Sequence, residues 1–211
     1  MRYILFGAGL FIMSLGISLV TKANLGTSPI SSVPYVLSLK FNLSFGQFTF
    51  IVNGLFILLE IVLLNKKFPK KQYFQIAVTV LFGFFVDVAM DLLFFINPSL
   101  YGQKILVLSG GCVVLALGIR MQVSANVIIN CAEGLVQIIA EKTGKEFGTV
   151  KIAFDMALVT LALVISLVVF GTIMGLREGT LVCALTVGLI TKLFKKIFQN
   201  LAAPLRRRAH R

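Results

Sequence analysis

Seven polar residues lie where they could bind a small solute inside an otherwise apolar chain. Asparagines, hydroxyl side chains and one carboxylate gather at two short segments, residues 24–45 and 126–147, and on the apolar stretches that follow them. Polar groups in hydrocarbon lose their hydrogen bonds to water, so they are expected to face protein or a polar cavity. The sequence therefore predicts one central solute-binding cavity, lined by Asn24, Thr27, Ser28, Asn53, Asn126, Asn130 and Asp155.

Two aspartates could carry a transported proton. Asp155 lies about two turns into an apolar stretch, where a charged group costs roughly 2.5–3.5 kcal/mol. Asp87 and Asp91 are four residues apart and share one helix face. Two carboxylates alone make a poor catalytic magnesium site, and helix–helix hydrogen bonding is the alternative role for Asp87. We expect coupling at Asp155 and Asp87, and no bound metal.

Other reactive chemistry is missing from the sequence. The one His, His210, lies in a basic terminal segment, and the three Cys residues each lie within an apolar stretch. There is no Gly-rich phosphate loop with Lys, no C-x-x-C and no G-x-S-x-G. We therefore expect that the chain is not an enzyme and needs no cofactor.

The composition indicates a polytopic membrane protein. Of the 211 residues, 58% are hydrophobic and 13% are charged, and the mean hydropathy is +0.97. A soluble domain usually carries about 25% charged residues, so a single soluble globule is excluded. Six stretches are long enough to cross a bilayer, at roughly 20 residues each. They lie near Tyr3–Thr21, Gly46–Leu64, Tyr73–Ile96, Lys104–Val123, Gly148–Phe170 and Leu176–Lys196.

The chain contains an internal repeat. A shift of 102 residues places Gly9 on Gly111, Asn53 on Asp155, and the motifs L-G-I, A-N and F-G of the first half on those of the second. Self-similarity at one fixed shift indicates a duplicated structural unit. The pattern predicts a single membrane domain, 1–198, with repeats at 3–96 and 105–198 and a basic tail at 199–211. Each repeat holds a span, a short segment and two further spans.

The positive charges predict the orientation of the repeats. A lysine cluster at 66–71 and the basic C-terminal tail should both face the cytoplasm. Both can do so only if the short segments fail to cross, which leaves three spans per repeat and inverts the second copy. We expect six transmembrane helices and cytoplasmic termini, with anionic lipid, not nucleic acid, at the tail. Glu60 is expected to form an interfacial ion pair with Lys66 or Lys67.

Each short segment is expected to form a re-entrant or an interfacial helix. The first contains A-N-L-G-T-S-P, in which Thr27 or Ser28 can cap a helix and the proline suits its first position. In the second, Asn126 keeps its place and Asn130 can cap. If these helix N-termini point into the membrane, their free N–H groups favour an anionic or carbonyl group. A helix lying flat on the membrane surface is the alternative.

Three motifs resemble a known family. Gly9–Pro29 reads G-L-F-I-M-S-L-G-I-S-L-V-T-K-A-N-L-G-T-S-P, F-G opens the next span, and Gly83–Asp87 reads G-F-F-V-D. They resemble the YczE/YyaS/YitT family of bacterial integral membrane proteins, and the likeness extends to about Phe198. The resemblance implies a bacterial inner-membrane location and supplies no catalytic or binding residues. The second repeat keeps only A-N of the A-N-L-G-T-S-P stretch, so two identical sites are not expected.

The sequence favours secondary transport or facilitated permeation of a small polar or anionic solute, with coupling to protons. The alternative is a non-transporting membrane regulator or assembly partner. The loops are too short to hold a soluble signalling domain, which counts against that alternative. The expected partners are the lipid bilayer and a small-molecule solute, and the oligomeric state is left open.

Overall fold

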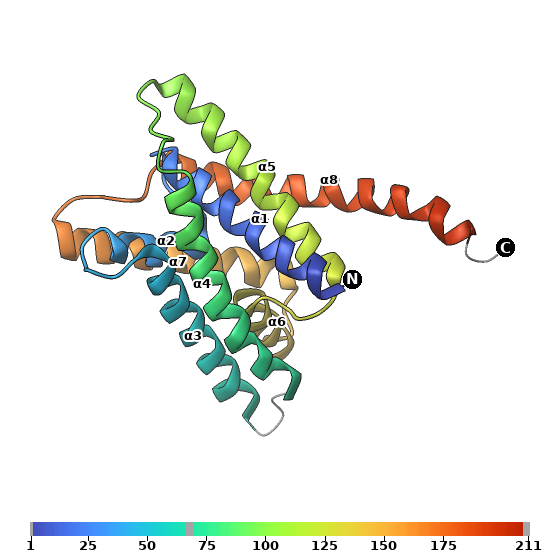
Figure 1. Ribbon diagram of the computed structural model, residues 1–211. Coiled ribbons are helices and arrows are strands. Elements are labelled where there is room, and N and C mark those ends of the chain that lie inside the picture. Colours follow the sequence, from blue (N-terminus) through green and yellow to red (C-terminus); the bar gives the residue numbers. More distant parts are fainter. Residues whose placement is uncertain (1, 66–69, 209–211) are drawn as a thin grey trace.

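Helices supply the regular structure of the chain, as the composition predicts (Figure 1). The computed structural model describes residues 2–65 and 70–208, and no strand occurs among them. The predicted all-α fold is therefore confirmed. The elements are, in chain order, α1 (Arg2–Lys22), α2 (Pro29–Ser38), α3 (Phe45–Leu64), the 3-10 helix η2 (Lys70–Tyr73), α4 (Phe74–Leu92), α5 (Tyr101–Ala125), α6 (Cys131–Thr143), α7 (Phe147–Phe170) and α8 (Glu178–Arg208).

Five helices of the described part are long and apolar enough to cross a membrane, namely α1, α3, α4, α5 and α7. Large apolar side chains lie exposed along them, such as Leu106 on α5 and Val168 on α7, and a bilayer would cover these surfaces. The sixth predicted span, Leu176–Lys196, falls in α8, whose apolar part Glu178–Thr191 is shorter than the other five. The helix continues beyond this part, so residues 199–208 of the predicted tail are helical.

The core is built on the contact between α1 and α5, which run antiparallel (Figure 1). Gly16 of α1 lies against the backbone of Leu115, and Gly118 of α5 lies against the backbone of Met13. The missing side chains at these glycines let the two helices approach closely. The residues of these two contacts are related by the 102-residue shift, since Met13 corresponds to Leu115 and Gly16 to Gly118. The two contacts are therefore equivalent to each other.

The two short segments form the short helices α2 and α6, of 10 and 13 residues. The 102-residue shift relates their starts, Pro29 and Cys131, and neither helix is long enough for a full crossing. Both α2 and α6 pack on α3 and on α7, while α1 packs on α4 and α5 packs on α8. α3 also packs along α4, and the described parts of α7 and α8 share no equally extensive contact.

Asn24 and Asn126 turn the chain from the first helix of each repeat into its short segment. Their φ angles are 55° and 49°, in the left-handed region that Asn adopts more readily than most side chains. The repeated A-N pair thus has a backbone role at the ends of α1 and α5. The repeated F-G marks the next helix starts, at Phe45 for α3 and Phe147 for α7.

Candidate functional site

A cavity of about 420 Å³, here called the central cavity, has residues of all eight α-helices in its wall. Much of the wall is apolar, including Met13 and Ile17 of α1 and Leu115 of α5. Cavities of this size suit small-molecule ligands, which usually bind among apolar side chains with a few polar groups that fix orientation. The polar side chains of this central cavity are Ser28, Ser31, Thr49, Asn53, Asn130, Glu133, Lys151, Asp155 and Thr191.

The first residues of α2 and α6 both border the central cavity. Ser28 precedes α2 and Asn130 precedes α6, and both have the extended backbone typical of an N-cap. Neither side chain makes a capping hydrogen bond; the Ser28 hydroxyl instead donates to Ser31 Oγ at 2.9 Å. Backbone N–H groups in the first turn of a helix have no partner within the helix and carry partial positive charge. The start of α2 has no acidic residue in its first turn and can attract an anionic ligand group, whereas Glu133 already places a carboxylate in the first turn of α6.

An ion pair on α7 provides the charged part of the wall. Lys151 Nζ lies 2.5 Å from Asp155 Oδ1, one helical turn away, and both side chains are about three-quarters buried. Glu133 of α6 borders the same cavity without an ion pair or hydrogen bond to any described residue. Burial raises the pKa of Glu133, the nearby Lys151 lowers it, and Asp155 raises it. Among the described side chains, the cavity thus holds two carboxylates for one ammonium group.

Asn53 of α3 is the most deeply enclosed amide of the cavity wall. Only 5% of its surface is exposed, and its side chain makes no hydrogen bond within the described part of the chain. An amide that borders a cavity without a protein partner is available to donate and accept hydrogen bonds there. Asn53 is also the repeat mate of Asp155, so the two repeats place equivalent positions on one cavity.

The structure brings together four of the seven residues predicted to bind solute. Ser28, Asn53, Asn130 and Asp155 line the central cavity. Thr27 does not, because it is fully buried between helices, where its Oγ1 lies 2.9 Å from Thr21 Oγ1. Its backbone N–H also donates to Thr180 Oγ1 at 3.3 Å, and this bond ties the segment before α2 to α8.

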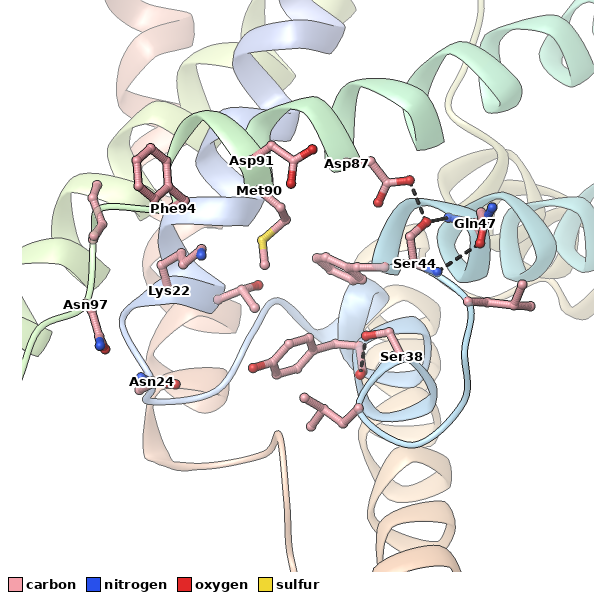
Figure 2. A pocket seen from close by; sticks show the side chains of 16 residues that line it. Lys22, Asn24, Ser38, Ser44, Gln47, Asp87, Met90, Asp91, Phe94 and Asn97 are labelled. Atoms are coloured by element: carbon pink, nitrogen blue, oxygen red, sulfur yellow. Dashed lines mark hydrogen bonds between the residues drawn. The ribbon is translucent and has the colours of Figure 1, made fainter.

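Asn24 and Asn126, which were predicted to line the same cavity, border two separate pockets. Asn24 lies with Lys22, Asp87 and Asp91 in a pocket of about 760 Å³, the Asp87 pocket (Figure 2). Asn126 borders a pocket of about 480 Å³, the Asn126 pocket. Both asparagines occupy the left-handed turns after α1 and α5, four residues before Ser28 and Asn130, which do line the central cavity.

Asp87 fixes the start of α3 (Figure 2). Its carboxylate accepts hydrogen bonds from Ser44 Oγ at 2.5 Å and from the Gly46 backbone N–H at 2.7 Å. The partial positive charge of the helix start stabilises this carboxylate. Gly46 also lies against the backbone of Gly83, so α3 and α4 meet closely at this point. These contacts give Asp87 the role of a hydrogen-bond acceptor between α4 and α3, which was the alternative to proton coupling. Its coupling role stays a prediction.

Asn130 and Glu133 border both the central cavity and the Asn126 pocket, so these two spaces adjoin at the start of α6. The Asp87 pocket shares no lining residue with the central cavity. Tyr35 and Phe45 border the Asp87 pocket, and their rings pack edge to face at 5.5 Å.

The structure places two carboxylates in surroundings that the sequence did not predict. Glu133 is the third residue of α6, so the predicted cap at Asn130 was the one sequence signal that could have pointed to it. Glu60 of α3 is fully buried against Gly134 of α6, and its oxygens have no hydrogen-bond partner within the described residues. The expected interfacial position of Glu60 is not observed because α6 covers it. Its predicted partners, Lys66 and Lys67, lie outside the described residues.

The fold and this site define a multi-pass, all-helical membrane protein with a largely apolar cavity that carries a few polar and charged groups. Residues 1–196 match the model of the Family of unknown function (DUF6198), and the chain belongs to that family.

Two relatives come from Bacillus subtilis (strain 168). The chain is 29% identical over 195 residues to the uncharacterized membrane protein YczE, covering 91% of this chain and 84% of the relative. It is 25% identical over 205 residues to the uncharacterized protein YyaS, covering 95% of each. The predicted resemblance is thereby confirmed. No solved structure matches the chain significantly.

Proposed function

We propose that the chain is a secondary transporter or facilitator that moves a small polar or anionic solute across the bacterial cytoplasmic membrane. The observation that carries this proposal is the central cavity, which lies among all eight α-helices and is bordered by the starts of both short helices. Short or broken helices that meet at a polar cavity are a recurrent way to bind solutes and coupling ions near the middle of a membrane.

Inverted repeats are part of the proposal. The 102-residue shift relates the starts of α2 and α6 and of α3 and α7, and it exchanges the glycine contacts between α1 and α5. Because α1 and α5 are antiparallel, an axis that exchanges them is perpendicular to both helices. If both helices cross the bilayer, this axis lies in the membrane plane, as expected for two inverted three-span repeats. The apolar part of α8 would supply the sixth crossing.

The proposed orientation places both chain termini and the lysine-rich connection before α4 in the cytoplasm. The support is the distribution of Lys and Arg, which favours the cytoplasmic side of bacterial membranes. In this orientation the Asn126 pocket opens to the cytoplasm and the Asp87 pocket to the outside. The basic tail would then lie where anionic lipid is available.

Proton coupling is assigned to Asp155. Its carboxylate borders the cavity and pairs with Lys151, so protonation would break this ion pair and change the charge that a solute meets. Asp87 is the second coupling candidate, through the hydrogen bonds that join α4 to the start of α3. Coupling through either residue needs no enzyme reaction and no bound metal.

Reconstitution tests the proposal. Proteoliposomes with the purified protein are challenged with polyols, short monocarboxylates, amines and amino acids, and permeation is followed by light scattering and an internal pH dye. At least one solute should cross faster than in protein-free liposomes, and Asp155→Asn should change its rate or pH dependence. Asp91→Asn, an exposed change in the Asp87 pocket, is the matched control.

The regulator alternative predicts a different outcome. If no solute in the panel crosses faster than in protein-free liposomes, transport is refuted. Recovery of a stable complex with another membrane protein would then favour an assembly or regulatory role. An Asp155→Asn variant that moves its solute with unchanged rate and pH dependence would refute the coupling assignment alone.

A further inference from the structure

We propose that the central cavity binds an amino-acid-sized zwitterion, with its ammonium group between Glu133 and Asp155 and its carboxylate at the start of α2 beside Asn53. This inference rests on the proposed function, because it names the solute class for the same cavity. It adds Glu133 as a binding residue and divides the cavity into an acidic side and an anion-binding side.

The acidic side lacks one positive charge. Lys151 is already paired with Asp155 at 2.5 Å, and Glu133 has no ion pair or hydrogen bond to a described residue. Among the described residues, the remaining titratable group on the wall is the thiol of Cys183 on α8, while Glu60 of α3 lies against Gly134 at another face of α6. A half-buried carboxylate that borders a cavity without an ion-pair partner can accept a ligand ammonium group.

The anion-binding side is formed by α2 and α3. The first turn of α2 contains no acidic residue, and its N-cap makes no side-chain capping bond, so its partial positive charge is uncompensated. Ser28 and Ser31 place two hydroxyl groups there. Asn53 supplies the independent observation, because this amide is 95% buried and has no hydrogen-bond partner in the described part of the chain. Its N–H group could donate to a ligand carboxylate.

One ligand with both charges satisfies both sides at once. A simple anion would leave Glu133 without a partner, and a simple cation would leave Asn53 and the start of α2 without one. The cavity volume of about 420 Å³ is sufficient for a small organic molecule. Glu133 and Asn130 also border the Asn126 pocket, so the ammonium site lies at the junction through which a solute could enter.

Ligand binding to the unaltered protein tests this inference. Each proteinogenic amino acid is screened for its effect on thermal unfolding, with a thiol-reactive dye that reports exposure of the three buried cysteines. The best amino acid is then compared by calorimetry with its decarboxylated amine and its deaminated acid. Each single-charge analogue should bind roughly 10- to 100-fold more weakly, since it loses one charge-assisted contact.

Matched variants locate the ammonium site. Glu133→Gln should weaken amino acid binding about tenfold or more, whereas its affinity for the deaminated acid should change little. Glu141→Gln is the control, because Glu141 lies exposed on the same helix and bonds to Gln137 at 3.0 Å. The comparison of the amino acid with its amine and its deaminated acid uses the unaltered protein. It therefore remains decisive even if Glu133→Gln fails to fold.

The possible failures can be told apart. Binding of no amino acid, or equal binding of the amine or the acid alone, overturns the zwitterion. If polyols, monocarboxylates or amines still permeate proteoliposomes in that case, the proposed function stands and only the solute class is wrong. Amino acid binding without any permeation would keep the site and refute transport.

Discussion

Replacing Gly16 by Ala tests whether the close contact of α1 and α5 holds the fold together. A methyl group at Gly16 would overlap the backbone nitrogen and Cα of Leu115, which cannot rotate away as a flexible side chain could. Overpacking typically costs about 1–3 kcal/mol, and alanine regains about 1 kcal/mol over glycine within a helix. With an overpacking cost of about 3 kcal/mol and a gain of about 1 kcal/mol from helix propensity, the free energy of unfolding should fall by about 2 kcal/mol.

Gly7→Ala is the matched control on the same helix. No atom lies within 4 Å of a methyl group built at Gly7, so this variant should gain up to about 1 kcal/mol from helix propensity alone. For a chain of this length, 1 kcal/mol corresponds to a Tm shift of about 2–4 °C. The Tm of Gly16→Ala should therefore fall by about 4–8 °C, and that of Gly7→Ala should rise by about 2–4 °C.

The assay is thermal unfolding of the purified protein in detergent, read by dye labelling of its buried cysteines. Gly118→Ala should match Gly16→Ala, because a methyl group there meets the backbone of Met13 in the equivalent contact. If Gly16→Ala is as stable as Gly7→Ala, the antiparallel glycine contact does not determine packing. Unequal losses at Gly16 and Gly118 would contradict the proposed equivalence of the two repeats.

Three further predictions concern capping, pH and topology. Asp87→Asn should lower the free energy of unfolding by about 1–3 kcal/mol, because it weakens the bonds to Ser44 and Gly46 at the start of α3; an unchanged Tm would contradict this role. Burial raises the pKa of Glu133 from its ordinary value of 4.5, so its stabilising effect is present at low pH and lost as pH rises through the folded-state pKa. The Tm of Glu133→Gln should therefore increase relative to the unaltered protein as pH rises, and parallel pH profiles would refute this. Cysteine labelling should place residue 68 and the C-terminus in the cytoplasm and residues 98–102 outside; an external C-terminus would refute the proposed orientation.

The repeated motifs predicted where helices begin and end because those signals are local. A shift of 102 residues located the starts of α2 and α6, and the F-G pair located those of α3 and α7. Proline at the first position of α2 and asparagine at the turns act through the backbone of the residue itself. Hydropathy likewise identified the spans, although the apolar part of α8 is shorter than the predicted sixth span.

The sequence by itself determined that the chain is an all-helical membrane protein, since composition and hydropathy need no long-range contact, and its motif spacing predicts two related halves. Only the tertiary structure decided which polar residues meet. One cavity is lined by Ser28, Asn53, Asn130 and Asp155. Thr27 lies away from it, because it is hydrogen-bonded to Thr21 of α1 and Thr180 of α8. The rotation and packing of each helix select the side chains that face a cavity, and for the same reason Glu133 was recognised only once α6 was placed against α7.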